Sequence, residues 1–192
     1  PPRAGCLCTP EQRVVGGTVG SVRAVKDQVP LAHAFVQALT LAPELQARMR
    51  VIMVGEGPLR AQAQAVLDAV SLGALAWLPG ERSDVADIMR GLHAFALPSL
   101  AEGISNTILE AMASALPVVA TAVGGNADLV VQGQTGYIGP PADPQALARR
   151  LVSLASHHPT ARIRGHLGRP RVAAPLNHRA LVTQDQLCNE HQ

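Results

Sequence analysis

The sequence predicts an α/β fold, a doubly wound parallel sheet of the Rossmann type. Three observations favour it. From Arg13 onward, short β-branched and apolar runs alternate with longer helical patterns, which is typical of repeated βα units. Hydrophobic residues make up 47% of the 192 residues but aromatic residues only 2%. A core of Ala, Val and Leu suits helices packed on buried parallel strands. Finally, glycine or proline follows most of the apolar runs.

Six apolar runs are predicted to be strands. They are residues 14–19, 51–54, 75–78, 94–97, 117–120 and 136–138. Turn residues follow them, as at Gly20, Gly55, Pro79 and Pro98. In parallel α/β sheets, ligands bind beyond the carboxyl ends of the strands, so these turns are where we expect the functional residues.

Helical patterns fill the intervals between these strands. They cover residues 27–40, 59–70, 85–91, 106–114, 126–131 and 144–155. In the first, Leu31, Ala34, Phe35, Ala38 and Leu39 recur at helical spacing and place one apolar stripe towards the sheet.

The ends of the chain lack such patterns. We expect an irregular segment over residues 1–12, one α/β domain over 13–156 and a poorly ordered or loosely docked tail over 157–192. The tail has no clear apolar stripe, and it contains prolines that would break a long helix.

Composition excludes several classes of protein. The formal charge is only +2 and the basic residues are mostly scattered, so a nucleic-acid binder is not expected. The three cysteines lack zinc spacing and no Asp-x-Asp cluster occurs, so no metal site is predicted. No apolar run reaches the ~18 residues that cross a bilayer, and a cytoplasmic location is expected.

The chemistry is concentrated after the fourth predicted strand, in residues 98–110. Ser105 is a candidate N-cap, so the free N–H groups of the following helix would face the crevice and attract a phosphate. Gly103 lets the backbone approach that ligand. Glu102 and Glu110 would repel a phosphate, so we expect them to accept hydrogen bonds from neutral hydroxyl groups. Either glutamate alone is more simply explained as a solvated charge. The two glutamates together with the helix start indicate a nucleotide sugar as the ligand.

This stretch, PSLAEGISNTILEAMASALPVVAT over residues 98–121, resembles the group 1 glycosyl transferases, which are retaining enzymes with the GT-B architecture of two Rossmann-like domains. Their donor domain, the carboxyl-terminal one, carries two glutamates separated by seven residues, as at Glu102 and Glu110. The similarity covers about residues 14–155 and is greatest to the branch linked to exopolysaccharide and capsule assembly. Other matching segments are VGSVRAVKD (19–27), VIMVGEGPLR (51–60), WLPGERSDV (77–85), AVGGNADLV (122–130) and QTGYIGPPADPQALA (134–148).

The resemblance implies a role for each matching position. Glu102 and Lys26 would be catalytic, with Glu102 on the sugar hydroxyls and Lys26 neutralising the donor diphosphate. Glu110 would hold the ribose. The remaining donor-binding residues would be Gly20, Gly55 and Gly57 lining the crevice, Pro79, Gly80, Glu81 and Arg82 at the nucleobase, and Gly103, Ile104 and Ser105 at the phosphates. No metal or other cofactor is implied beside the nucleotide-sugar substrate.

Two positions depart from the family's pattern. Ser21 stands where an arginine usually clamps the diphosphate, and Asp128 stands where glutamate is common. A bidentate cation is therefore lost, which bears on catalysis more than on the fold.

The sequence thus predicts the donor-binding half of a retaining glycosyltransferase that acts in polysaccharide or glycoconjugate synthesis. Its partner would be an amino-terminal acceptor domain absent from this chain, and any association with a membrane would come only through that domain. Two alternatives stay open, namely a GT-B sugar-nucleotide epimerase domain and a non-catalytic, truncated donor-binding fragment. An NAD-binding domain is a weaker third, because residues 16–20 lack the G-x-G-x-x-G spacing.

Overall fold

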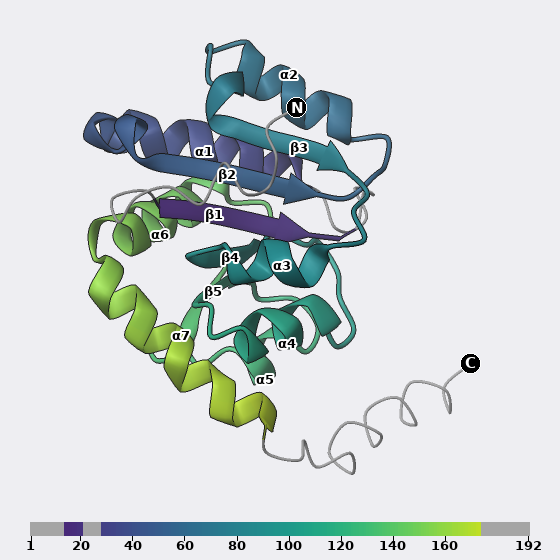
Figure 1. The fold of residues 1–192 in the computed structure, drawn as a ribbon, viewed down its shortest axis with the longest axis vertical. Coiled ribbons are helices and arrows are strands. Elements are labelled where there is room, and N and C mark those ends of the chain that lie inside the picture. The colour runs from purple at the N-terminus through teal and green to yellow at the C-terminus, as the bar shows by residue number, and fades with distance from the viewer. Residues whose placement is uncertain (1–13, 21–27, 174–192) are drawn as a thin grey trace.

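A computed structural model of the chain describes residues 14–20 and 28–173. Six strands form a single parallel sheet in the order β3-β2-β1-β4-β5-β6 (Figure 1). The strands are β1 (Val14–Val19), β2 (Met49–Val54), β3 (Ala76–Gly80), β4 (Ala94–Leu97), β5 (Val118–Thr121) and β6 (Gly136–Gly139). The chain winds outward from β1 to β3, then returns to β4 beside β1 and winds the other way. The predicted doubly wound fold is confirmed, with its switch point between β1 and β4.

Helices connect the strands, as the sequence pattern predicted. They are α1 (Val29–Leu41), α2 (Arg60–Asp68), α3 (Val85–Arg90), α4 (Asn106–Ala113), α5 (Asn126–Leu129), α6 (Pro144–Ser156) and α7 (His158–Ala173), with short 3₁₀ turns η3 (Pro43–Ala47) and η4 (Gly73–Leu75). Four strands, β2, β3, β5 and β6, extend one or two residues beyond their predicted ends. Met49 pairs with Val14, and Gly80 pairs with Val54, so neighbouring strands set these limits.

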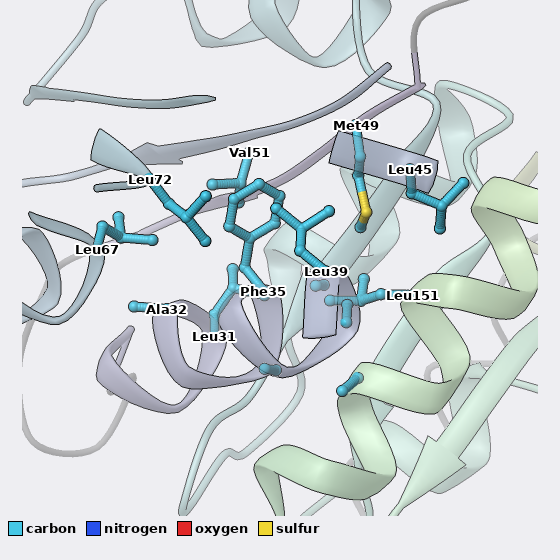
Figure 2. Close-up of a cluster of buried hydrophobic side chains, with 14 of the residues drawn as sticks. Leu31, Ala32, Phe35, Leu39, Leu45, Met49, Val51, Leu67, Leu72 and Leu151 are labelled. Carbon is cyan, nitrogen blue, oxygen red and sulfur yellow. The ribbon is translucent and has the colours of Figure 1, made fainter. Parts of the chain in front are cut away.

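The sheet separates two apolar layers. On one face, α1 packs against α2 and α6, and Phe35 lies fully buried at the centre of a cluster of leucines, valines and methionines (Figure 2). On the other face, Phe95 of β4 packs in a cluster with Ile108 and Met112 of α4. Each face thus buries aliphatic side chains, as a sheet with helices on both sides requires.

Residues 158–173 of the predicted tail form helix α7, which packs against α4 and α6. Pro159 falls in the first turn, where its missing N–H costs nothing, and Pro170 lies in the last turn. The buried face of α7 consists of small residues, such as Ala161 and Gly168, so it shows no stripe of large apolar residues. The rest of the predicted tail and the segment 1–12 lie outside the described residues.

Within residues 14–20 and 28–173, none of the helices combines the length and the apolar character needed to span a bilayer.

Candidate functional site

Three neighbouring strand ends are tied together at the carboxyl edge of the sheet. The Gly20 N–H donates to the Val54 carbonyl at 3.0 Å, and the Gly55 N–H donates to the Gly80 carbonyl at 2.9 Å. Gly80 has φ +82°, and a Cβ there would lie 2.6 Å from Glu56 Oε2. Glycine at this turn therefore serves the backbone conformation, since the exposed Glu56 carboxylate could move aside for a Cβ.

An open depression of about 450 Å³ lies beyond these strand ends. Among the residues that line it are Gly20, Gly55, Glu81 and Arg82, which the sequence predicted as donor-binding residues. The structure thus brings four predicted residues from three strand ends into one hollow. Gly57 lines a neighbouring depression of about 270 Å³.

Arg82 is held by a bidentate pair with Asp84, with nitrogen-to-oxygen distances of 2.8 and 2.7 Å. The hydrogen bonds to Asp84 raise the pKa of Arg82, and those from Arg82 lower the pKa of Asp84. The guanidinium also lies 5.9 Å from the centre of the Trp77 ring. Arg82 is thereby oriented at the rim of the larger depression as a fixed cation.

Arg60 links the loop that follows β2 to strand β3. Its guanidinium donates twice to the Leu78 carbonyl, at 3.2 and 2.8 Å, and once to Glu56 at 3.3 Å. The loop that follows β2 is therefore held against β3. The predicted donor-binding residues Pro79 and Gly80 come directly after Leu78, whose carbonyl accepts these hydrogen bonds.

The loop after β4 is braced from β5. The Ser99 hydroxyl donates to Glu102 Oε1 at 2.6 Å, and the Thr121 hydroxyl donates to the Ser99 carbonyl at 2.5 Å. Ser99 is fully buried, Thr121 is buried and Glu102 is half-buried. A short bond to a carboxylate is charge-assisted and strong, so the chain Thr121–Ser99–Glu102 fixes the carboxylate beside the switch point.

A pair of glycines after β5 contacts the same loop. The Gly125 N–H donates to the Gly103 carbonyl at 2.9 Å. Gly124 has φ +52°, and a Cβ there would overlap the carbonyl oxygen of Glu102. Gly103 differs, because a Cβ on it would meet none of the described residues within 4 Å and its φ is not positive. The fold therefore does not require glycine at 103, whereas a ligand that approaches the backbone would.

Helix α4 begins where the sequence predicted. Ser105 is its N-cap, with an extended ψ of 102° and a side chain that accepts from the Ile108 N–H at 3.4 Å. Ile104 is 40% exposed beside it. Glu110 is exposed and lies about one turn inside the helix.

Three buried polar residues near the site were not singled out from the sequence. Gln28 is 2% exposed, and its Nε2 donates to the Gly20 and Val54 carbonyls at 3.4 and 3.3 Å. Its Oε1 has no hydrogen-bond partner among the described residues. Ser99 and Thr121, described above, are the other two. The order of the strands in the sheet is needed to see that Gln28, Ser99 and Thr121 lie at the strand ends. The sequence did point to Gly124 and Gly125, which lie in the matching segment AVGGNADLV.

Comparison with known proteins identifies the family to which this chain belongs. The sequence model described as "Glycosyl transferases group 1" matches residues 13–157, three quarters of the chain. The chain belongs to this family.

Relatives of this glycosyltransferase chain are longer proteins. It is 32% identical to the Vi polysaccharide biosynthesis protein VipC/TviE of Salmonella typhi over 122 residues, which are 63% of the chain and 21% of that protein. Across the most similar curated relatives, the chain spans 21–42% of their length.

Two solved structures show the same fold. One is the C-terminal domain of a glycosyl transferase group 1 family protein (LpcC) from Francisella tularensis, at TM-score 0.75 and 23% identity, with 84% of this chain and 85% of that chain covered. The other is Anabaena Alr3699/HepE in complex with UDP-glucose, also at TM-score 0.75 and 23% identity, with 93% and 48% covered. These two structures support the fold, and the match to the family model confirms the predicted resemblance and enzyme class at the level of the family.

The individual site assignments of this glycosyltransferase stay predictions. Lys26 and Ser21 lie outside the described residues. In the part that is described, no group of three or more His, Cys, Asp or Glu side chains is arranged to hold a metal ion. That the donor binds without a metal or other cofactor likewise stays a prediction.

Proposed function

We propose that this chain is the donor-binding domain of a retaining glycosyltransferase, which transfers a sugar from a nucleotide-diphosphate sugar to an acceptor hydroxyl during polysaccharide or glycoconjugate synthesis. The observation that carries the proposal is the braced loop at the switch point. It presents Glu102, the open backbone of Gly103 and the start of α4 together. The HepE structure, which shares the fold, contains UDP-glucose, and this supports a nucleotide sugar as the ligand.

The functional groups of the loop after β4 and of the start of α4 match different parts of the donor. The first turn of α4 and the Gly103 backbone offer N–H groups and a positive dipole end, which favour the diphosphate. The Glu102 carboxylate is fixed by Ser99 and accepts hydrogen bonds from sugar hydroxyls, while Glu110, one turn away, accepts from the ribose. The depression beside Gly20, Glu81 and Arg82 takes the nucleobase side of the ligand.

In the proposed reaction the bond between the anomeric carbon and the diphosphate oxygen breaks. Negative charge therefore grows on the departing diphosphate, and electrostatic stabilisation of that charge lowers the barrier. Lys26 and the start of α4 supply the positive potential without a metal or other cofactor. The acceptor oxygen forms its bond to the anomeric carbon on the same face that the diphosphate leaves, and its proton passes to the departing diphosphate oxygen. The configuration is therefore retained without an enzyme-linked intermediate. An amino-terminal acceptor domain, for which the longer relatives leave room, would position that hydroxyl.

Calorimetric titration with UDP, GDP and UDP-glucose tests the donor site. Glu110→Gln should weaken UDP and UDP-glucose alike, by about 5–30-fold, because a charged hydrogen bond to the ribose is lost. Glu102→Gln should weaken UDP-glucose by a similar factor and leave UDP nearly unchanged. If GDP binds better than UDP, the same comparison is made with GDP-mannose.

Glu44→Gln is the matched control, because Glu44 is an exposed glutamate on η3. Its affinities should equal those of the wild type. Absence of heat with both nucleotides in the wild-type chain would refute the donor-binding proposal. Equal losses for UDP and UDP-glucose in Glu102→Gln would refute the assignment of Glu102 to the sugar.

A further inference from the structure

Helix α7 is strongly basic. Residues 158–173 contain Arg162, Arg164, Arg169 and Arg171 and no acidic residue. The helix packs against α4 and α6 through a narrow face of small residues. A Cβ on Gly165 would overlap the carbonyl oxygen of Ala115, so this face lies directly on the domain. The opposite face of α7 therefore points away from the body of the protein.

That outer face is apolar. Ile163 and Leu167 are one turn apart, and they are 60% and 53% exposed. Pro159 and Pro170 are also exposed and continue the same row at helical spacing. We name these four residues the α7 ridge. Large aliphatic side chains in water forgo the free energy of burial, so a continuous row of them marks a contact surface.

Arginines flank the ridge on both sides. At roughly 100° per residue, Arg162 and Arg169 lie on one side and Arg164 and Arg171 on the other. Arg164 donates to the Gly133 carbonyl at 3.0 Å, and Arg171 donates to the Asp128 carbonyl at 3.4 Å, so both stems lie along the domain rather than over the ridge. The apolar row is left uncovered between two rows of positive charge.

We propose that the outer face of α7 binds the surface of an anionic phospholipid bilayer, so that membrane association would not come only through an amino-terminal domain, as the sequence led us to expect. An interfacial helix needs an apolar row that enters the headgroup region and flanking cations that meet the phosphates, and α7 offers both. Arginine stems are long enough to keep the guanidinium groups at the phosphates while Ile163 and Leu167 lie deeper. A nucleic acid would pair with the arginines but would leave the aliphatic ridge in water.

A hollow beside the ridge supports the same ligand. This pocket of about 330 Å³ is lined by Arg90, His93, His158, Arg162 and His166, among others, and none of the described residues that line it is acidic. Arg162 belongs both to this pocket and to the flank of the ridge. A headgroup phosphate can therefore enter the pocket while the ridge contacts the acyl region.

Binding at α7 leaves the candidate donor site open. In Figure 1, α7 follows the lower left of the molecule, whereas the arrowheads of β1, β2 and β3 point to the right. A bilayer lying against α7 would not cover those strand ends. The proposal therefore does not depend on the proposed donor site, and either can fail without the other.

Vesicle co-sedimentation of the full chain tests the proposal. We expect the wild type to bind vesicles of phosphatidylcholine with 30–40% phosphatidylglycerol (roughly the anionic content that gives a strong surface potential) at low salt, and to bind pure phosphatidylcholine far less. Ile163→Ser/Leu167→Ser should lower the partition coefficient about ten-fold or more. Arg162→Gln and Arg169→Gln should each lower it about five-fold, with a weaker salt dependence.

Matched controls come from the same chain. Leu41→Ser/Val70→Ser removes two similarly exposed apolar residues outside α7, and Arg149→Gln removes an exposed arginine of α6. Both should bind vesicles like the wild type. Because all substituted residues are exposed, urea unfolding curves should stay close to the wild type.

Five results would each overturn the proposal. The wild type fails to sediment with anionic vesicles, or it binds neutral and anionic vesicles equally. The α7 variants bind as well as the controls. Sedimentation velocity shows that the ridge variant turns a dimer into a monomer with vesicle binding unchanged, which would make the ridge a contact between copies of the chain. A short RNA binds with the same dependence on the arginines but not on the ridge, and vesicles do not compete with it.

Discussion

At the scale of single residues, Gly103 and Gly124 illustrate two different reasons for a glycine. Gly124 combines φ +52° with direct contact against the Glu102 carbonyl, so the fold itself excludes a side chain there. Gly103 has open space around its Cα and an ordinary φ, so no internal contact excludes one. The two glycines therefore predict opposite outcomes when each gains one methyl group.

We predict that Gly103→Ala keeps the free energy of unfolding within about 0.5 kcal/mol of the wild type but weakens UDP binding, because the new Cβ enters the space assigned to the phosphate. Gly124→Ala should instead lower the free energy of unfolding by about 1–3 kcal/mol, through strain and displacement of the Glu102 loop. Urea unfolding and UDP calorimetry measure the two effects.

Gly133→Ala is the control for conformational strain alone. Gly133 has φ +75°, but no neighbouring atom lies within 4 Å of the place that an added methyl group would occupy. Its substitution should therefore cost only about 1 kcal/mol. A smaller loss in Gly124→Ala than in Gly133→Ala would contradict the proposed contact between Gly124 and the loop.

At the scale of elements, the start of α4 shows which features of the site the sequence can predict. The sequence predicts Ser105 as the N-cap of the helix at Asn106, and it is, because capping depends on residues close in sequence. The brace from Thr121 through Ser99 to Glu102 is not predictable in this way, because it depends on β5 lying beside β4. Sequence patterns identify local features of the site, whereas contacts across the sheet need its strand order.

Helix α7 escapes prediction for a related reason. Its buried side consists mainly of Ala and Gly, whose positions carry no hydrophobic signal. Ile163 and Leu167 face outward, and Val172 alone of the larger aliphatic residues packs against the core. A search for an apolar stripe of core residues therefore finds none. Packing against α4 stabilises this helix despite Pro170, since tertiary contacts outweigh intrinsic propensity.

A second helix start gives a quantitative prediction. Asp143 caps α6, and its Oδ1 accepts from the Ala146 N–H at 2.8 Å. Asp143→Ala should lower the free energy of unfolding by about 1 kcal/mol, because that N–H loses its partner. Asp143→Asn, which keeps an acceptor, should recover most of the loss. Urea unfolding of both variants provides the measurement, and equal stability of the alanine and wild-type chains would show that the cap contributes nothing.

At the scale of the whole molecule, His93 joins three parts of the chain at the amino edge of the sheet. It lies just before β4, and its Nδ1 accepts from the Val15 N–H of β1 at 3.1 Å. Its ring centre is 5.0 Å from that of His158, the first residue of α7. Burial, followed by the neighbouring His158 and Arg162, lowers the pKa of His93. The folded protein therefore favours the neutral imidazole, in which Nδ1 is free to accept.

This arrangement predicts a pH dependence of stability. An unfolded histidine has its pKa near 6.5, and the folded value for His93 is lower. As the pH falls below 6.5, the unfolded chain binds the proton first, so the free energy of unfolding falls until the folded pKa is passed. At neutral pH both states are unprotonated, and the full stability is present. Protonation at Nδ1 would also remove the acceptor for the Val15 N–H.

The expected result is that His93→Asn loses less stability than the wild type between pH 7 and pH 5, since asparagine keeps an acceptor but does not titrate. His33→Asn, which alters an exposed histidine of α1, should follow the wild-type curve. Urea unfolding at half-unit pH steps gives the three profiles. Parallel profiles for wild type and His93→Asn would mean that the loss of stability in acid comes from groups other than His93.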